Sequence, residues 1–466
     1  MIARDLLLIV SFITFSCVSN RGFYKSNHKK QISDYINSVI DESEINSLLG
    51  ISIVSLANDE KLYDFNSKKL LVPASNMKLF TAASSLYFLD PGHKFKTLIL
   101  KRKNNLILKG GADPGLSINN LDSLAVIISK QLNNVDTLFL DGNLFDSKYY
   151  GKGWMWDEGS NEYSAPVSGL AVNHNCIDFE YSPGKIGNPA NIRLLPHTNY
   201  VSIDNRSLTV SDTINYKPLK IERDWVNQTN HFLITGEILY YDLKDTIKKN
   251  IYEPILFTGT IFKEILESHN VAVNNLSIDD IPNPTDSLSE HISDSMIFYL
   301  DNMMHKSENL TAESFIKYLG INDSSNGNWE NGVRTVKSFI NDNIAIDTTA
   351  LRIADGSGLS RYNQLSANQI VQLLSYMNKT QWKDSFINIL PHGGEKESSL
   401  EDRLTSANKR IYAKTGSMSG ISCLSGYAFS PKYGPLAFSI LINGFTGPLA
   451  PIREIQDQIC EWLVRN

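Results

Sequence analysis

The sequence has few cysteines and none of the residue spacings that commonly hold a metal ion. Four cysteines occur in 466 residues, no C-x-x-C pair is present, and the nine histidines are scattered without an H-E-x-x-H pattern. Zinc sites need Cys and His at short, regular spacings, so the sequence predicts neither a metal site nor a cofactor. We expect Cys176, Cys423 and Cys460 to be free, buried thiols, because a chain of this size does not need disulfide bonds for stability.

An excess of positive charge is also missing. The chain has 44 Lys and Arg against 50 Asp and Glu, which gives a formal net charge of -6. Nucleic-acid-binding proteins usually have a basic domain or stripe, so the sequence predicts no nucleic-acid partner. The hydrophobic fraction of 42% is ordinary for a globular protein, and the length predicts roughly two to four domains.

Long apolar runs are absent except near the N-terminus, where residues 6–15 are mostly apolar. A membrane span needs about 20 apolar residues, so this stretch is too short. It is typical of the apolar part of a secretory signal, which predicts a signal peptide over residues 1–19 and export of the chain. A buried N-terminal helix is the alternative. Cleavage after Ser19 would give a periplasmic protein, whereas cleavage before Cys17 would give a membrane-anchored lipoprotein with its lipid on that cysteine.

The two ends of the chain have the same pattern, a helix beside a pair of strands. The periodicity predicts helices over 29–45, 71–89 and 450–466, and hairpins over 50–66 and 420–444. One sheet with strands from both ends, covered by these helices, would bury all of these apolar faces.

The middle of the chain contains a helix-then-strand pattern twice, at 121–144 and 253–278. We predict that these are the two halves of an inserted α/β domain, and that the Pro-containing run 281–287 is the linker that leaves it. The polar, turn-rich stretch between the halves predicts a further β-rich insertion. The predicted limits are 20–91 and 286–466 for the first domain, 92–170 and 235–285 for the inserted domain, and 171–234 for the nested insertion.

A serine at a predicted helix start has a lysine three positions later. Ser75 follows Pro73, where backbone N–H groups are free, and Lys78 lies one turn further on the same face. A serine hydroxyl needs a neighbouring base to attack a carbonyl, and lysine serves when burial lowers its pKa. The S-x-x-K pattern alone is weak evidence, because it also occurs at residues 26–29. An ordinary amphipathic helix start therefore stays an alternative at this point.

Two further triplets make the signal specific. Ser307-Glu308-Asn309 and Lys414-Thr415-Gly416 follow Ser75 in that order. S-x-x-K, then S-x-N, then K-T-G is the signature of penicillin-binding proteins and serine β-lactamases. Gly416 on a strand lets a ligand approach the backbone closely, and backbone N–H groups of Ser75 and Ser417 would form an oxyanion hole.

The sequence resembles the D-alanyl-D-alanine carboxypeptidases/endopeptidases of the class C low-molecular-mass penicillin-binding proteins. Beyond the three motifs, the resemblance lies in "LKGGADPGLS" (108–117), "LDGNLFDSKYY" (140–150), "GWMWDEGSNEYSAPVSGLAVNHN" (153–175), "SENLTAESFIKYLG" (307–320) and "DGSGLSRYNQLS" (355–366). It covers nearly the whole chain after the signal. It implies an α/β (α+β) fold, in which a penicillin-recognising serine transpeptidase/β-lactamase-like domain carries two nested inserted domains.

The resemblance also implies roles for the motif residues. Ser75 would be acylated by the penultimate D-Ala of a peptidoglycan stem peptide, and Lys78 would take its proton. Ser307 and Lys414 would relay a proton to the departing D-Ala, and Asn309 would hydrogen-bond the substrate amide. Water would release the acyl-enzyme, and β-lactams would inhibit by forming a slowly hydrolysed ester.

Members of this family have a pocket for the diamino acid of the stem peptide. The family usually has Asp where this chain has Glu158, with Asp157 adjacent, which leaves the preferred side chain open. A structural ion pair of Arg361, and core positions for Trp154 and Trp156, are the alternatives. The substrate-binding residues implied by motif match are Thr415, Gly416, Ser417, Met418, Glu158, Tyr163, Leu359 and Arg361.

The predicted function is that of a serine-type D-Ala-D-Ala carboxypeptidase, with D,D-endopeptidase activity as an extension of the same chemistry. A serine β-lactamase is one alternative, weakened because no deacylating Glu is evident in the class A arrangement. A non-catalytic cell-wall-binding protein is the other, weakened because every motif residue is intact. The predicted partners are peptidoglycan stem peptides, with β-lactams as inhibitors.

Overall fold

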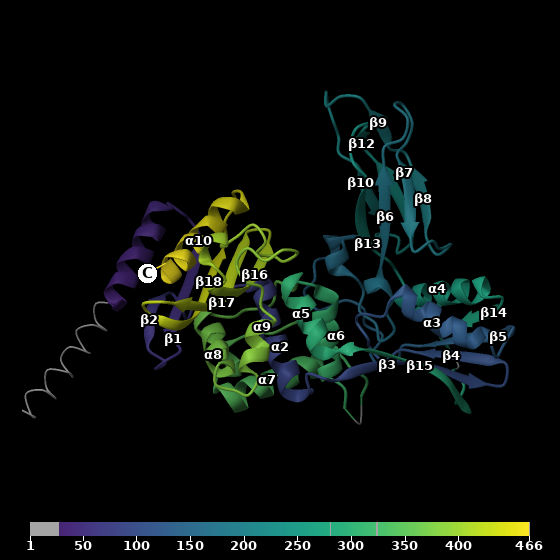
Figure 1. Cartoon of the computed structure of the whole chain (residues 1–466), viewed down its shortest axis with the longest axis horizontal. Coiled ribbons are helices and arrows are strands. Elements are labelled where there is room, and N and C mark those ends of the chain that lie inside the picture. Colours follow the sequence, from purple (N-terminus) through teal and green to yellow (C-terminus); the bar gives the residue numbers. More distant parts are fainter. Residues whose placement is uncertain (1–27, 280, 323–324, 466) are drawn as a thin grey trace, which may run out of the picture.

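The structure is a computed structural model of the chain, and it describes residues 28–279, 281–322 and 325–465. Figure 1 shows strands gathered in three regions, one containing both ends of the described chain and two containing its middle. The predicted signal segment and Cys17 lie outside the described residues. Within them, no helix is both long enough and apolar enough to cross a membrane.

A five-stranded antiparallel sheet joins the two ends of the chain, which confirms the prediction of a shared sheet. Residues of β1 pair with β18, with Ile51 opposite Ile440. In spatial order the strands are β16 (Ile411–Met418), β17 (Ile421–Ser430), β18 (Gly434–Asn443), β1 (Leu48–Ser55) and β2 (Lys61–Phe65).

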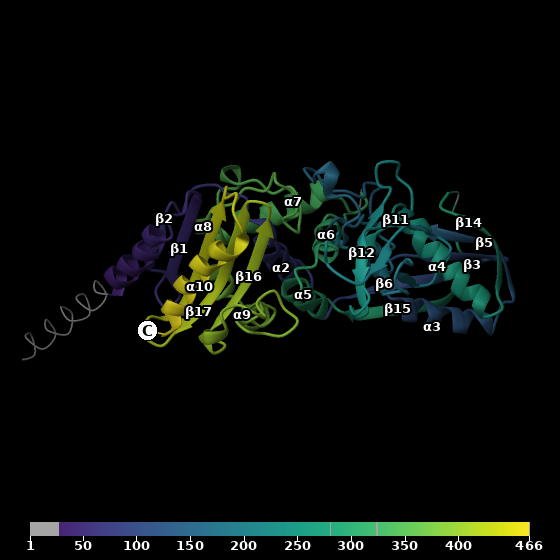
Figure 2. The same ribbon diagram turned by 90° about the horizontal axis from the view of Figure 1, so that it is seen from above.

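Side chains alternate between the two faces of this sheet and supply two separate cores. Ile440 and Ile442 pack with the C-terminal helix α10 (Leu449–Arg465) and with the helix at residues 28–42. Leu441 between them faces the other core, which α2 (Met77–Phe88) and α8 (Ala367–Met377) share. Figure 2 shows α10 lying over the sheet. The predicted terminal helices are therefore confirmed, whereas the helix predicted over 71–89 begins only at Met77.

Helices between the sheet and the middle of the chain complete the core that contains α2. The side chains of α5 (Met296–His305), α6 (Asn309–Leu319) and α7 (Trp329–Phe339) pack into it. Two shorter elements, α9 (Lys383–Asn388) and the π-helical turn η5 (Ile340–Ile344), also contribute.

A second five-stranded sheet forms from the predicted inserted domain. The two helix-then-strand patterns are confirmed: α3 (Ile118–Ser129) leads to β5, α4 (Pro254–Ser268) leads to β14, and the two strands pair in parallel. The predicted end of this region at residue 285 is too early, because β15 follows it and pairs with β3. In spatial order the strands are β14 (Ala272–Ser277), β5 (Asn134–Asp141), β4 (Asn105–Lys109), β3 (Lys94–Arg102) and β15 (Asp286–Ser295).

Three small sheets form the remaining β-rich region, which projects away from the second sheet in Figure 1. The predicted limit at residue 234 is also too early, because β12 and β13 pair with strands β9 and β6 of this region. The division into domains otherwise stays a prediction. The sheets are β13 (Asp245–Asn250) with β6 (Cys176–Ser182) and β7 (Asn191–Leu195), β10 (Lys220–Arg223) with β11 (His231–Thr235) and β8 (Ser202–Asn205), and β12 (Glu237–Leu239) with β9 (Leu208–Val210).

The prediction for the three cysteines is confirmed, since Cys176, Cys423 and Cys460 are free and buried. Each thiol lies in a core, and burial raises its pKa. A raised pKa keeps these groups as thiols at neutral pH, so they behave as small apolar side chains.

Close packing between α6 and α7 generates a test of the fold. A Cβ added at Gly332 of α7 would lie 1.8 Å from the carbonyl oxygen of Ile316 in α6. In a free helix, Gly to Ala is favourable by about 1 kcal/mol, but overpacking costs about 1–3 kcal/mol. Gly332→Ala should therefore lower the midpoint of thermal unfolding measured by circular dichroism. Gly447→Ala, where a Cβ meets nothing within 4 Å, should leave the midpoint unchanged, and equal midpoints for all three proteins would contradict the packing.

Candidate active site

Ser75 lies in a tight turn that precedes helix α2. The turn is the 3-10 element η1 (Ala74–Asn76), and Lys78 follows in the first turn of α2. Ala74 has a positive φ of 45°, which is strained for a residue with a side chain. This geometry brings the Lys78 Nζ within 3.0 Å of the Ser75 Oγ, so the helix-start alternative without a shared site is wrong.

The Lys78 amine is the point where three segments of the chain meet. Its Nζ donates to the Asn309 Oδ1 at 2.6 Å and to the carbonyl oxygen of Ser357 at 2.9 Å, and it lies in hydrogen-bond contact with the Ser75 Oγ. The side chain is fully buried, and burial lowers the pKa of Lys78 to about 7. Nearby carboxylates, Glu313 first, raise the pKa in part. An amine in this setting is a base at neutral pH.

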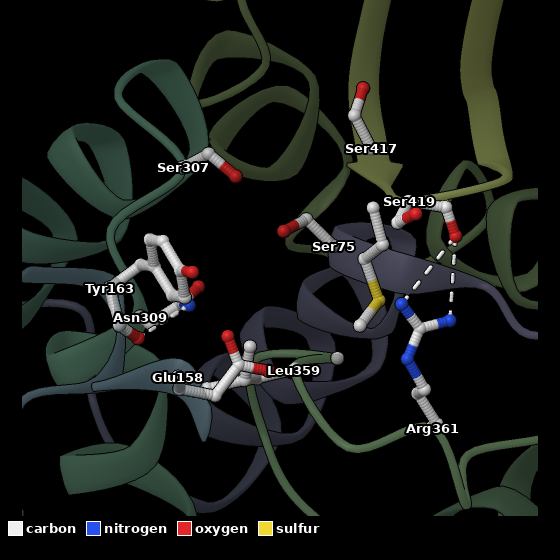
Figure 3. A pocket seen from close by; sticks show the side chains of 11 residues that line it. Ser75, Glu158, Tyr163, Ser307, Asn309, Leu359, Arg361, Ser417 and Ser419 are labelled. Carbon is white, nitrogen blue, oxygen red and sulfur yellow. Dashed lines mark hydrogen bonds between the residues drawn. The ribbon is translucent and has the colours of Figure 1, made fainter. Parts of the chain in front are cut away.

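The S-x-N triplet occupies the turn before α6. Ser307 has a positive φ of 59° and Asn309 is the first residue of α6. The amide of Asn309 contacts both sides of the site, because its Oδ1 accepts from Lys78 and its Nδ2 donates to the carbonyl of Tyr163 at 2.9 Å. Figure 3 shows the hydroxyls of Ser75 and Ser307 facing the same space.

The K-T-G triplet lies on the edge strand β16, directly against the turn that carries Ser75. A Cβ at Gly416 would lie 3.0 Å from both the Ser75 N and the Pro73 carbonyl oxygen, so any side chain here would push the turn of Ser75 away from the strand. The Asn76 Nδ2 donates to the Lys414 carbonyl at 3.0 Å and ties strand to turn. Burial, with the charge of Lys78 as a second cause, lowers the pKa of Lys414 well below its usual value.

A pocket of about 400 Å³ opens over these groups. Most of the predicted site residues line this pocket. The exceptions are Gly416, which forms part of the wall behind Ser75, and three buried residues, Lys78, Lys414 and Thr415. Figure 3 shows Glu158 and Leu359 at the side opposite Ser417. The lining contains Ser75, Glu158, Tyr163, Ser307, Asn309, Gly358, Leu359, Arg361, Ser417, Met418 and Ser419.

The residues predicted to bind the stem-peptide side chain all line this pocket, with Tyr163 and Arg361 on opposite sides of it in Figure 3. Burial and the neighbouring Glu158 carboxylate raise the pKa of the Tyr163 hydroxyl. Arg361 contacts the Ser419 carbonyl at 3.4 and 3.5 Å and, among the described residues, has no ion-pair partner. Trp154 is half-buried and donates to Asp355, whereas Trp156 is 75% exposed. The alternatives of a structural ion pair for Arg361 and a core position for Trp156 are therefore wrong.

Two buried carboxylates that the sequence analysis missed hold the loop that contacts Lys78. Glu313, one turn after Asn309, accepts from the backbone N–H groups of Gly356 and Ser357 at 3.0 and 2.7 Å and from the Trp329 indole at 2.7 Å. Asp355 accepts from the backbone of Gly358 and from the Asn363 amide. Burial raises the pKa of both acids, and the N–H donors oppose the shift.

Gly358 of this loop is the remaining missed residue. Its φ is +87°, and a Cβ would lie 1.9 Å from the carbonyl oxygen of Ala74. The loop therefore packs directly against the turn of Ser75. The signal was present in "DGSGLSR", where one acid precedes two glycines, but nothing in one sequence says which backbone these residues meet.

Comparisons with known proteins agree with this arrangement. The model of the D-Ala-D-Ala carboxypeptidase 3 (S13) family matches residues 32–466. A D-alanyl-D-alanine carboxypeptidase from Actinomadura sp. (strain R39) is 32% identical over 92% of this chain and 84% of its own.

Solved structures show the same fold. Penicillin binding protein 4 from Haemophilus influenzae has a TM-score of 0.81 at 22% identity, over 92% of this chain and 99% of that one. A second structure of that protein, complexed with a β-lactam, has a TM-score of 0.74 at 21% identity, over the same shares of the two chains. The predicted fold class and family are confirmed, and the chain belongs to the D-Ala-D-Ala carboxypeptidase 3 (S13) family.

Proposed function

We propose that this protein removes the terminal D-Ala from peptidoglycan stem peptides through an acyl-enzyme on Ser75. The single observation that carries the assignment of residues is the buried Lys78 amine, 3.0 Å from the Ser75 Oγ and 2.6 Å from the Asn309 Oδ1. A neutral lysine in hydrogen-bond contact with a serine at the wall of a pocket is an activated nucleophile. Membership of the S13 family supports the substrate class.

In the proposed reaction, the Ser75 oxygen attacks the carbonyl carbon of the penultimate D-Ala while Lys78 takes the hydroxyl proton. The developing oxyanion would be stabilised by the backbone N–H groups of Ser75 and Ser417. The C–N bond then breaks, and Ser307 with Lys414 passes a proton to the departing amine. Water next attacks the ester and frees Ser75. If the departing amine belongs to a second, cross-linked stem peptide instead of to D-Ala, the same reaction is a D,D-endopeptidase reaction.

Charge placement disfavours a site in which Lys78 and Lys414 are charged at the same time. Lys78 and Lys414 are both fully buried, and the charge of Lys78 is one cause of the lowered pKa of Lys414. Two like charges in one buried site are unfavourable. A substrate carboxylate at Thr415 and Ser417 would favour the charged form of Lys414. The base and the carboxylate-binding cation would thus be different lysines.

The end of the pocket beyond Leu359 would hold the diamino acid of the stem peptide. Glu158 would pair with its amine and Arg361 with its carboxylate, since guanidinium groups match carboxylate geometry. Tyr163 and Met418 would contact the aliphatic chain between them. We also propose that the chain is exported, with a signal over residues 1–19 that ends in cleavage after Ser19 or in a lipid on Cys17.

Incubation with a penicillin tests the nucleophile. Wild-type protein should gain the mass of one penicillin and keep it, and Ser75→Ala should gain none, as followed by intact mass over time. Loss of penicillin without a lasting adduct would instead identify a serine β-lactamase. If wild type shows neither adduct nor penicillin loss, the catalytic assignment is wrong and a binding role becomes the better explanation.

The pH dependence of acylation tests Lys78 as the base. Because burial lowers the pKa of Lys78 to about 7, the neutral amine predominates above that pH. The rate of penicillin acylation should rise with pH through about 7 and then level off. Lys78→Arg keeps the positive charge but removes the base, and should slow acylation by about 10²–10⁴-fold. A rate that falls through pH 7 would mean that the ammonium form is the active one.

Glu313 provides a third test, because it holds the loop whose carbonyl accepts from Lys78. In Glu313→Gln an amide NH₂ replaces one of the two carboxylate oxygens. The NH₂ cannot accept a hydrogen bond from the backbone N–H groups of the loop, so acylation should slow. Loss of the nearby negative charge should also move the rising part of the pH profile to lower pH. Glu330→Gln is the matched control, since Glu330 is 85% exposed on α7. A profile like that of wild type would contradict the role of Glu313.

A further inference from the structure

A second pocket lies beside the active-site pocket and shares Glu158 with it. Three separate parts of the chain line it: residues 150–164, the turn at 223–228 after β10, and Tyr252 after β13. Its volume of about 400 Å³ equals that of the active-site pocket. The small β sheets therefore supply one wall of a cavity next to the catalytic groups.

Three tryptophans line this second pocket, and the rings of two of them, Trp156 and Trp225, contact each other. Trp156 is 75% exposed, and its ring centroid lies 4.9 Å from that of Trp225 with the planes inclined by 52°. Such exposure is unusual for tryptophan, which gains more than most side chains from burial. The negative face of an aromatic ring attracts weakly positive hydrogens, and the C–H face of a sugar ring presents these in a flat array.

A buried cation without an ion pair among the described residues lies in the same lining. Arg223 is 5% exposed, and its guanidinium donates to the Thr229 carbonyl and to the Asn250 Oδ1, both neutral groups, at 3.0 Å. Its neighbour Asp224 accepts from Asn227 instead, and within the described part of the chain Arg223 has no ion pair. A buried charge without a partner is costly, and a guanidinium binds carboxylates well, so an acidic ligand fits this site.

We propose that the second pocket binds the sugar-bearing part of the same substrate, with a sugar ring against Trp156 and Trp225 and a carboxylate of the stem directed to Arg223. This inference rests on the proposed function. A stem peptide runs from its sugar, through the diamino acid, to D-Ala-D-Ala. When D-Ala lies at Ser75 and the diamino acid lies at Glu158, the sugar-bearing part of the substrate continues past Glu158. The second pocket begins at this residue.

The experiment compares release of D-Ala from a stem pentapeptide and from the same peptide attached to its disaccharide. Wild type should have the higher kcat/KM for the disaccharide-bearing substrate. The double variant Trp156→Ala/Trp225→Ala should lower that value roughly two- to tenfold, the range expected for lost ring contacts, and leave the pentapeptide value unchanged. The matched control is Tyr240→Ala/Tyr241→Ala, which removes another exposed aromatic pair, with ring centroids 5.2 Å apart, in the turn after β12.

Equal losses for both substrates would overturn the proposal, as would a wild type without preference for the sugar. The affinities of the pentapeptide and of the disaccharide-bearing peptide for Ser75→Ala, measured by calorimetry, give the same comparison without turnover. Stronger binding of the disaccharide-bearing peptide, reduced by the tryptophan substitutions, supports the second pocket even where no D-Ala is released. Failure of the penicillin adduct on wild type would count against the proposed function alone.

Discussion

The burial of one lysine amine is the constraint on which the rest of the site depends. Lys78 is completely enclosed, and its Nζ is held by a serine hydroxyl, an asparagine oxygen and a backbone carbonyl. These groups belong to the turn before α2, to α6 and to the loop at 355–360, so all three must be in place at once. Removing an ammonium from water is unfavourable, and this cost is what makes a lysine a base near neutral pH.

Strain at the motif residues is consistent with this dependence. Ala74 and Ser307 both have positive φ values, at 45° and 59°, and such conformations persist only where the surroundings determine them fully. The turn of Ala74 is fixed by Gly416 on one side and by Gly358 on the other, each without a side chain at the contact. The S-x-x-K and K-T-G motifs are therefore positioned by packing of backbone against backbone, which leaves their side chains free for chemistry.

The sequence was sufficient for the motifs, the shared sheet and the helix–strand repeats, because each has a local pattern or an ordered signature. It was insufficient for the limits of the inserted regions. The strands β13 and β15 are polar or half-exposed, and β12 has only three residues. Their partners lie far away in sequence, so no local periodicity assigns these strands. Glu313 was missed for a related reason. In sequence it is one acid in an amphipathic helix, and only the fold shows that it is fully buried against the Ser357 loop.

The structure also gives the β-rich insertion a part in the active site. Asn250, at the end of β13, donates to the carbonyl of Asn161 at 2.8 Å and accepts from Arg223 at 3.0 Å. The segment that Asn250 holds carries Tyr163, whose carbonyl accepts from the Asn309 amide. A continuous series of hydrogen bonds thus runs from the insertion to the residue that orients Lys78. Because Asn250 and Arg223 are buried, displacement of the insertion would leave their polar groups unsatisfied, which is costly. The insertion and the catalytic core are therefore one structural unit at this point, although they are far apart in sequence.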